Sequence, residues 1–301
     1  MDRMYKIGLY EKAMPKDIGW KEKFQVAKSA GYDYIEISID ETDEKLARLD
    51  WSDAQIRDVV SVAYGESMSF GSICLSGQRR YALGDKDETK SLELLKKAIR
   101  FARVAGIPVI QMAGYDTYYA QSTEETEKRF FANLALGTAM AAKEGIILAF
   151  ETMETPFMDT VEKAMTYVKT VESPYLGVYP DMEKAMCRIA PIASAYLGVY
   201  PDIGNLNNAA LLYNHDILAD IEKGRGHIVA AHIKETMPGK YREVQFGTGV
   251  VDFERILKKL WQLGVRRYVT ELWYTGNDDW KQAINEASSL ARKILDGFGG
   301  I

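Results

Sequence analysis

Short apolar runs alternate with longer amphipathic segments from one end of the chain to the other. Each apolar run has the length of a strand, and each is followed by a polar loop and then by a segment with helical spacing of its apolar residues. Repeated strand–helix units of this kind are typical of a parallel sheet covered by helices. We count eight units, with strands expected at 6–10, 34–38, 69–75, 108–112, 146–151, one of two copies of Tyr-Leu-Gly-Val-Tyr, 228–232 and 268–272.

The amphipathic segments carry start and stop signals of helices. Asp252 precedes apolar residues at the i, i+3, i+4 and i+7 positions that begin at Phe253, which is the pattern of an N-cap followed by one buried helix face. Glycines end several of these segments shortly before the next expected strand, which is the usual place for a helix C-terminus. These glycines are Gly31, Gly106, Gly145 and Gly264.

The whole chain, residues 1–301, is expected to form a single domain. Its 301 residues exceed the usual domain size, but α/β barrels routinely use a chain of this length as one domain. No change in composition and no Gly/Ser-rich or Pro-rich linker divides it. Eight units therefore predict an α/β fold, a closed (β/α)8 TIM barrel, in preference to a doubly wound open sheet, which periodicity alone does not exclude.

One irregularity interrupts the sixth unit. Residues 161–181 and 182–202 align without gaps and share Glu-Lys-Ala-Met and Tyr-Leu-Gly-Val-Tyr-Pro-Asp, so a helix–strand segment of 21 residues is duplicated. Two copies are too few for a stacked repeat protein. We expect the second strand to enter the barrel, because Ile203-Gly204-Asn205 follows it and supplies a turn that the first copy lacks. The additional residues are then expected to form an outward loop at the flank of the barrel.

Charge and cysteine content exclude several classes of protein. The 38 Lys and Arg against 43 Asp and Glu give a net charge of −5, which argues against broad binding to nucleic acid or to an anionic membrane. Cys74 and Cys187 stand in unrelated contexts, so we expect two reduced core cysteines. The charged start of the chain leads directly into a strand, and no apolar run has the length of a membrane span, so we expect a cytoplasmic protein.

The candidate chemistry lies where apolar strands end in polar residues. The carboxyl ends of the strands form the active face of a parallel α/β barrel. Three carboxylates and one imidazole at such positions form an oxygen-rich set that suits Mn²⁺, Mg²⁺, Co²⁺ or Zn²⁺, and their charge requires a cation. These metal-ligand candidates, on the fifth to eighth expected strands, are Glu151, Asp202, His232 and Glu271.

The sequence gives weaker evidence that other polar residues take part in metal or substrate binding. His215, within a polar helical stretch, and His227, before a strand, are expected to be surface or capping residues. With three histidines in total the chain cannot build the multi-zinc site of a barrel-type DNA repair endonuclease, which removes the main nucleic-acid hypothesis. Side chains that could hold an anionic group of a substrate are Lys12, Arg79, Arg80 and Lys234.

The chain resembles the L-ribulose-5-phosphate 3-epimerases, also called L-xylulose-5-phosphate 3-epimerases, of the xylose-isomerase-like barrel superfamily. The resemblance covers nearly the whole chain. The segments that carry it are Gly8-Leu-Tyr-Glu-Lys-Ala13, 40–51, Cys74-Leu-Ser-Gly-Gln-Arg-Arg80, Gln111-Met-Ala-Gly-Tyr-Asp116, Tyr200-Pro-Asp-Ile-Gly-Asn-Leu206, His227-Ile-Val-Ala-Ala-His-Ile-Lys234 and Phe246-Gly-Thr-Gly-Val-Val-Asp-Phe253.

The resemblance implies a chemistry for these residues. A divalent metal held by the same four ligands would bind the C2 carbonyl and C3 hydroxyl of a pentulose 5-phosphate, and the C3 proton would leave on one face and return on the other. Epimerisation then needs two bases, for which we expect Glu151 and Glu271. The substrate contacts expected from the matching loops are Lys12, Arg79, Asn205 and Lys234.

Several alternatives stay open at this point. Asp181 keeps the family's usual chain distance from Glu151, whereas Asp202 keeps the turn that follows it, and we expect Asp202 to be the ligand. The loop after the third expected strand reads Gly-Gln-Arg-Arg, where the family more usually has a histidine before the arginines. The protein could instead be a ketose epimerase or isomerase acting on another sugar, or a non-catalytic sugar-phosphate binding barrel. The sequence also leaves open a homodimer.

Overall fold

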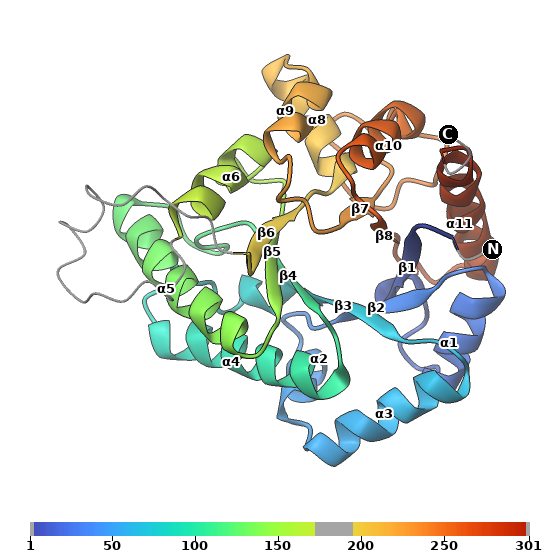
Figure 1. Cartoon of the computed structure of the whole chain (residues 1–301), viewed down its shortest axis with the longest axis horizontal. Helices are drawn as coiled ribbons and strands as arrows, with labels where there is room; N and C mark the ends of the chain where they lie inside the picture. The colour runs from blue at the N-terminus through green and yellow to red at the C-terminus, as the bar shows by residue number, and fades with distance from the viewer. Residues whose placement is uncertain (1–2, 172–194, 299–301) are drawn as a thin grey trace.

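Eight parallel strands form the centre of the molecule and helices surround them (Figure 1). The computed structural model describes residues 3–171 and 195–298. The sheet order is β6-β5-β4-β3-β2-β1-β8-β7, so consecutive strands are neighbours around a barrel. The strands are β1 (Lys6–Tyr10), β2 (Tyr34–Ser38), β3 (Phe70–Leu75), β4 (Val109–Ala113), β5 (Ile147–Glu151), β6 (Leu197–Tyr200), β7 (Ala231–Ile233) and β8 (Arg267–Thr270).

The barrel closes between β6 and β7. No regular ladder joins these two strands in the described residues, but isolated parallel bridges pair Val199 with Ile228 and Asp202 with His232. Backbone hydrogen bonds from Val199 N to His227 O and from His232 N to Pro201 O, at 2.8 and 2.9 Å, accompany these bridges. The expected TIM barrel is confirmed, in a nearly closed form.

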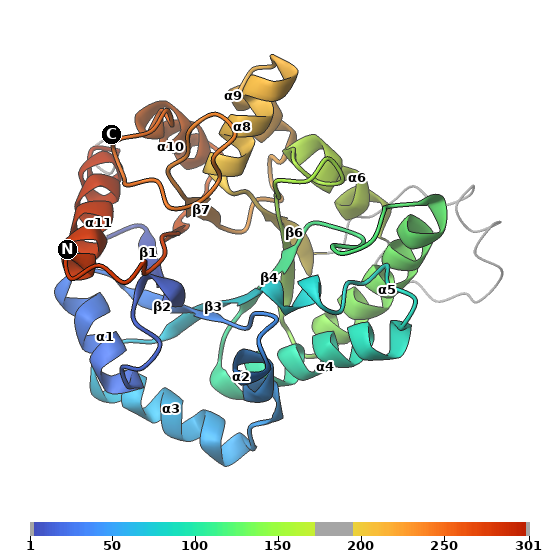
Figure 2. The same cartoon turned by 180° about the vertical axis from the view of Figure 1, so that it is seen from behind.

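The helices lie outside the strands in both views of the barrel (Figures 1 and 2). They are α1 (Trp20–Ser29), α2 (Asp43–Leu46), α3 (Asp53–Gly65), α4 (Glu88–Ala105), α5 (Glu124–Lys143), α6 (Val161–Thr170), α8 (Ile203–Tyr213), α9 (Ile217–Lys223), α10 (Phe253–Gln262) and α11 (Trp280–Asp296). In the part of the chain that the structure describes, three short 3-10 helices follow strands or α2, namely η1 (Glu11–Ala13), η2 (Ala47–Asp50) and η3 (Ser76–Arg79).

Capping residues that the sequence predicts are found at the ends of helices in the structure. Asp252 caps α10, with its side chain accepting a hydrogen bond from Arg255 N at 3.0 Å. The four apolar positions of that helix are buried. Gly106 ends α4 in the left-handed region, with φ of 69°, which a residue with a Cβ adopts only with strain.

The strands are buried on both faces, as expected for a parallel sheet covered by helices. Alternation along β2 sends Ile35 and Ile37 toward the helices and Tyr34 and Glu36 into the barrel. The ring of Tyr34 fills the space next to Gly8 and Gly71 of the neighbouring strands, where any added Cβ would collide with it. Small residues on β1 and β3 thus make room for one large side chain inside the barrel.

Two sequence expectations differ from the structure. The seventh strand was expected at 228–232, but β7 covers only Ala231–Ile233, because the preceding residues bridge to β6 singly and do not form a ladder. His215 was expected within a helix, but it lies between α8 and α9, after Asn214 has ended α8 with φ of 50°.

The second copy of the duplicated strand enters the barrel as β6, which confirms that expectation. The helix of the first copy is α6. The first copy of the strand, Asp181 and the expected outward loop lie outside the described residues, as does Cys187. Cys74 is a buried free thiol, as predicted.

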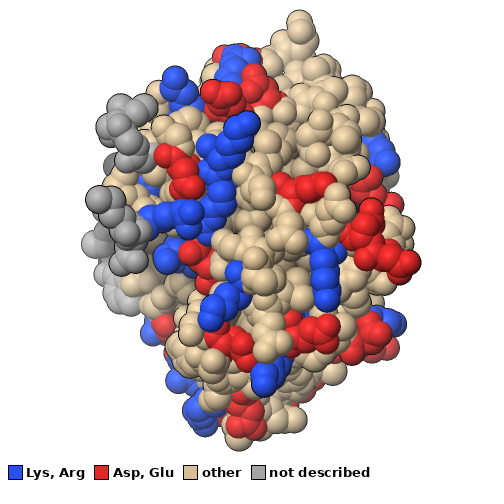
Figure 3. Space-filling view, turned by 90° about the vertical axis from the view of Figure 1, so that its right-hand side faces the viewer, with Lys and Arg blue, Asp and Glu red and all other residues tan. Residues whose placement is uncertain are grey.

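The surface offers no simple charge pattern on the face drawn in Figure 3. Basic and acidic side chains stand next to each other there, without one large area of a single sign. Among the described residues, no helix combines the length and the apolar character that a membrane span requires.

Candidate metal centre

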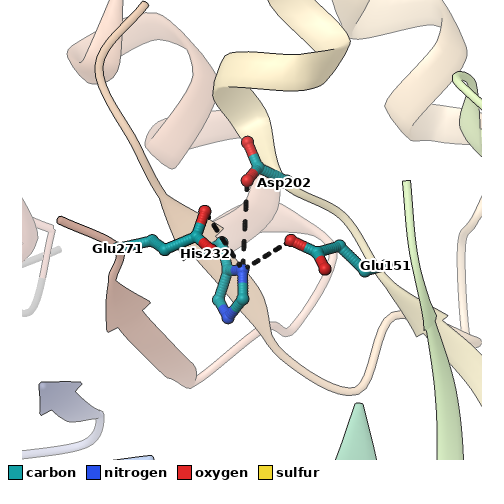
Figure 4. Close-up of side chains that lie close together, drawn as sticks. All are labelled: Glu151, Asp202, His232 and Glu271. Carbon is teal, nitrogen blue, oxygen red and sulfur yellow. Dashed lines mark hydrogen bonds and ion pairs between the residues drawn. The ribbon is translucent and has the colours of Figure 1, made fainter. Parts of the chain in front are cut away.

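Four polar side chains from the carboxyl ends of consecutive strands meet at one end of the barrel (Figure 4). Glu151 is the last residue of β5, Asp202 follows β6, His232 is the middle residue of β7, and Glu271 follows β8. One potential ligand atom of each residue lies within 4.8 Å of the others, and all four residues are buried. The four positions predicted from strand ends therefore form one cluster.

The imidazole of His232 stands at the centre of this cluster. Its Nδ1 lies 3.0 Å from Glu151 Oε1, 3.8 Å from Glu271 Oε2 and 3.9 Å from Asp202 Oδ2. Its Nε2 lies on the other side of the ring, 2.7 Å from Glu36 Oε1. In Figure 4 Glu151 and Glu271 approach Nδ1 from opposite sides, with Asp202 above it.

Neighbouring groups fix the carboxylates. Gln111 Nε2 donates to Glu151 Oε2 at 2.5 Å from the adjacent strand β4. Asp202 is the N-cap of α8, because its Oδ1 accepts a hydrogen bond from Asn205 N at 2.9 Å. The Ile-Gly-Asn turn that distinguished the second copy of the strand is therefore the start of a helix that orients the carboxylate.

Lys234 brings a positive charge into the same site. Its Nζ lies 2.5 Å from Asp202 Oδ2 and 3.3 Å from Glu271 Oε2, and it donates to Asn205 Oδ1 at 2.8 Å. The lysine is only 4% exposed, so these oxygens replace the water that its ammonium group loses on burial.

Burial and charge shift the pKa values of the cluster in opposite directions. Burial raises the pKa of Asp202 to about 8, assisted by the charges of Glu271 and Glu151 and opposed by Lys234. Burial also acts to raise the pKa of Glu271, but the charges of Lys234 and His232 outweigh it and lower that pKa to about 2. For His232, burial lowers the pKa, but Glu36 and Glu271 outweigh burial and raise it well above its ordinary value.

The residues present fit a divalent cation. Asp202 Oδ2 and Glu271 Oε2 are buried and accept no hydrogen bond of acceptable geometry, although Lys234 is near both. The three carboxylates outnumber Lys234, and the raised pKa values of Asp202 and His232 mean that added protons offset the negative charge; a divalent cation would take the place of those protons. Oxygen-rich sets with one imidazole suit Mn²⁺, Mg²⁺, Co²⁺ or Zn²⁺.

The cavity above the cluster is lined by all four residues that the sequence suggested as substrate contacts, namely Lys12, Arg79, Asn205 and Lys234. Lys12 is paired with Asp40 at 2.6 Å. Arg79 makes no ion pair with a carboxylate in the described part of the chain, and its guanidinium lies over the ring of Tyr118, 5.2 Å from the centroid. Arg79 is thus a charge available to an anionic ligand.

Some residues that line the cavity were not predicted from the sequence, and one predicted residue lies outside the cavity. Trp273 and Arg242 line the cavity without having been predicted, and Arg242 stands over the ring of Trp273, whereas Tyr10 lines it from the end of the first expected strand. The end of β1 gave a signal for Tyr10, but loop residues such as Arg242 gave none. Arg80, by contrast, is paired with Asp43 at 2.5 Å at the surface, outside this cavity. His215 and His227 are not part of the cluster in the described residues.

This fold, with an acidic cluster and one histidine at the barrel mouth, defines a xylose isomerase-like TIM barrel, and the family model of that description matches residues 24–190 and 182–294. The L-ribulose-5-phosphate 3-epimerase UlaE of Escherichia coli O157:H7 is 38% identical over 283 residues, which cover 93% of this chain and 91% of the relative. The protein of that name from Salmonella paratyphi A is 39% identical over 296 residues, 97% and 93% of the two chains. The chain belongs to the L-ribulose-5-phosphate 3-epimerase family, and it is an isomerase of the carbohydrate epimerase type.

Solved structures agree on the fold. The 3-keto-D-glucoside 4-epimerase YcjR of E. coli superposes with a TM-score of 0.70 at 18% identity, over 96% of this chain and 99% of that one. D-Psicose 3-epimerase of Clostridium cellulolyticum H10 gives a TM-score of 0.72 at 14% identity, over 96% and 99%. The alternative of a non-catalytic binding barrel is set aside because the curated relatives at 38–39% identity are epimerases.

Proposed function

We propose that the protein interconverts L-ribulose 5-phosphate and L-xylulose 5-phosphate by epimerisation at C3, with a divalent metal held by Glu151, Asp202, His232 and Glu271. The observation that carries the proposal is the buried cluster in which four ligand atoms lie within 4.8 Å of one another at the carboxyl ends of β5 to β8. The names of the curated relatives, at 38–39% identity, support the substrate.

A metal bound by these residues supplies Lewis-acid chemistry, since it polarises the ketose and acidifies the proton at C3. The remaining steps belong to side chains of the protein. Glu151 and Glu271 are the outer members of an arc of four strands, so they flank whatever lies in the middle of the cluster. One carboxylate takes the C3 proton, and the electron pair of the broken C–H bond passes into an enediolate.

The other glutamate, which starts in its protonated form, then delivers a different proton to the opposite face of C3, so that the configuration inverts and the first glutamate keeps the proton that it removed. Lys234 contributes a donor for the oxygen on which negative charge develops, because its ammonium group is fixed between Asp202 and Asn205 before reaction. Arg79 and Lys12 are proposed to hold the phosphate, and Asn205 to orient the sugar, at the mouth of the cavity. The substrate is a small sugar phosphate, with no role for nucleic acid or membrane.

The test is incubation of the metal-loaded protein with L-ribulose 5-phosphate in D₂O, followed by NMR. Deuterium at C3 together with formation of L-xylulose 5-phosphate, abolished by a chelator and restored by metal, is the expected result. Exchange at C1 would indicate an aldose–ketose isomerase instead. Equal turnover of L-ribulose without phosphate would remove the proposed role of Arg79 and Lys12.

Two variants sharpen this test of the two-base assignment. Glu271→Gln and Glu151→Gln should each abolish net epimerisation, while each retains the base that acts on one face. Each variant should then exchange C3 hydrogen for deuterium in only one of the two epimers, without inversion. Metal analysis of both variants is the control, because a variant that has lost its metal reports on binding and not on proton transfer. Undiminished epimerisation by either metal-loaded variant contradicts the assignment.

A further inference from the structure

Glu36 is a carboxylate completely buried inside the barrel, below the four residues of the candidate metal centre. It lies in the middle of β2, a strand whose five residues are all buried, and its exposed fraction is 0%. The strand alternation places it on the interior face, opposite Ser72 of β3 and Tyr10 of β1 in the strand register. None of the ligands comes from β2, so the metal cluster does not account for an acidic residue there.

The contacts of Glu36 divide between its two oxygens. Oε2 accepts hydrogen bonds from Ser72 Oγ at 2.6 Å and from Tyr200 OH at 3.1 Å. Oε1 faces His232 Nε2 at 2.7 Å. Within the described residues, neither Lys nor Arg pairs with this carboxylate, and the imidazole of His232 is its one charge-capable partner.

This arrangement has a chemical consequence for His232. A carboxylate can only accept at Oε1, so Nε2 must carry the hydrogen of that contact. The other ring nitrogen, Nδ1, faces Glu151, Asp202 and Glu271, so a hydrogen on Nδ1 is the one that a cation bound between these three carboxylates would displace. A histidine can bind a cation only through an unprotonated nitrogen, and the hydrogen bond at its far nitrogen selects which one that is.

We propose that Glu36 is a positioning residue of the metal centre, which fixes the Nε2–H tautomer of His232 and the orientation of its ring, and makes Nδ1 a better donor to the cation. The inference rests on the proposed metal site. It assigns to β2 a part in a centre whose ligands come only from β5 to β8. The ring of Tyr200, which is T-shaped to that of His232 at 5.0 Å, blocks rotation of the imidazole from another side.

The experiment measures metal affinity by competition with a fluorescent chelator, using Mn²⁺ and Zn²⁺, in the wild type and in two variants. Glu36→Gln keeps an oxygen that accepts from Nε2–H but removes the charge, and should weaken binding about 10-fold. Glu36→Leu removes the acceptor as well, and should weaken it up to about 100-fold, the range found when such outer partners are lost. Ser72→Ala is the matched control, because it removes a hydrogen bond to Oε2 and leaves the contact with His232 intact, so its affinity should change by less than about 3-fold.

A second readout separates positioning from a general effect on folding. The chain has three histidines, so the ¹⁵N signals of His232 can be assigned with His215→Asn and His227→Asn variants. In the Zn²⁺-loaded wild type we expect a proton on Nε2 and none on Nδ1. A proton on Nδ1, or wild-type affinity in both folded Glu36 variants, overturns the inference. Failure of the wild type to bind either ion would instead overturn the proposed metal site itself, and with it the role of Glu36.

Discussion

Lys234 Nζ lies 2.5 Å from Asp202 Oδ2, so an ammonium group just after β7 meets a carboxylate just after β6, at the place where the barrel closes. Both side chains are buried. Because the same ammonium also reaches Glu271 and Asn205, its position is fixed without help from a substrate.

Replacing this lysine should therefore affect turnover more than metal binding. In Lys234→Met we expect kcat/KM to fall by about 10²- to 10³-fold, the loss typical of one preorganised donor to a developing oxyanion, while the protein still binds a divalent ion. Lys240→Met, at an exposed position, is the control and should leave kcat/KM unchanged. Steady-state kinetics and metal titration of both variants check this, and a Lys234 variant with normal turnover contradicts it.

The duplicated strand allows a direct test of which aspartate is the ligand. Asp202→Asn removes a carboxylate from the cluster and should weaken metal binding by at least about 10²-fold, since it loses a charged ligand. Asp181→Asn, at the equivalent position of the first copy, should bind metal like the wild type. Loss of metal in the Asp181 variant alone would reverse the assignment.

One copy of the duplicated segment should be dispensable. Deletion of residues 175–195 joins Pro174 to Tyr196 and leaves the helix of the first copy followed by the strand of the second. The connection between α6 and β6 would then consist of residues 171–174 and 196, a length common for such loops. We expect the shortened chain to keep its metal affinity within about 3-fold, because neither the ligands nor α8 is altered. Circular dichroism and metal titration measure this, and an unfolded product is the contrary outcome.

The packing of Tyr34 against the glycines beside it should make the barrel interior sensitive to an added methyl group. Gly8→Ala would place a methyl group against the Tyr34 ring, which is held by a hydrogen bond from its hydroxyl to Tyr268 O at 2.8 Å. Overpacking of this kind should lower the free energy of unfolding by about 1–3 kcal/mol. Gly65→Ala is the matched control in α3, where nothing lies within 4 Å of the added Cβ, and it should stabilise by about 0.5–1 kcal/mol. Urea denaturation of both variants tests the contrast.

The buried ion pairs of Glu11 should stabilise the folded protein. Its carboxylate is buried and pairs with Lys23 at 2.9 Å, Lys45 at 2.7 Å and Arg48 at 2.6 Å. Glu11→Gln leaves three buried cations without their anion, and should lower the free energy of unfolding by about 3–5 kcal/mol at pH 7. Glu22→Gln, exposed on α1, should change it by less than about 0.5 kcal/mol.

The same residue predicts a pH dependence. Burial acts to raise the pKa of Glu11, but hydrogen bonding and charge from Arg48, with Lys23 and Lys45, outweigh it and lower that pKa far below its ordinary value. A lowered pKa in the folded state contributes stability above the unfolded pKa of about 4.3 and loses it as the pH falls below about 5. The difference in unfolding free energy between the wild type and Glu11→Gln should therefore shrink steadily below about pH 5. A difference that grows on acidification contradicts the sign.

The barrel and its four ligand candidates were predictable because both follow from local rules. Strand period and the common direction of parallel strands bring Glu151, Asp202, His232 and Glu271 to one face whatever the details of packing. The contact between Glu36 and His232 was not predictable, because it depends on how the closed barrel aligns strands that lie far apart in the sequence. The predicted extent of β7 was wrong for a related reason, since an apolar sequence does not reveal whether neighbouring backbones form a full ladder or single bridges.

The seam between β6 and β7 gives the cluster a second significance. These two strands are the edges of the sheet, and they are joined by isolated bridges, one of which pairs Asp202 with His232. A cation held jointly by those side chains would therefore connect the two edges of the sheet and complete the circle that the backbone closes only in part. The binding free energy of such a cation would then also stabilise the closed form of the barrel.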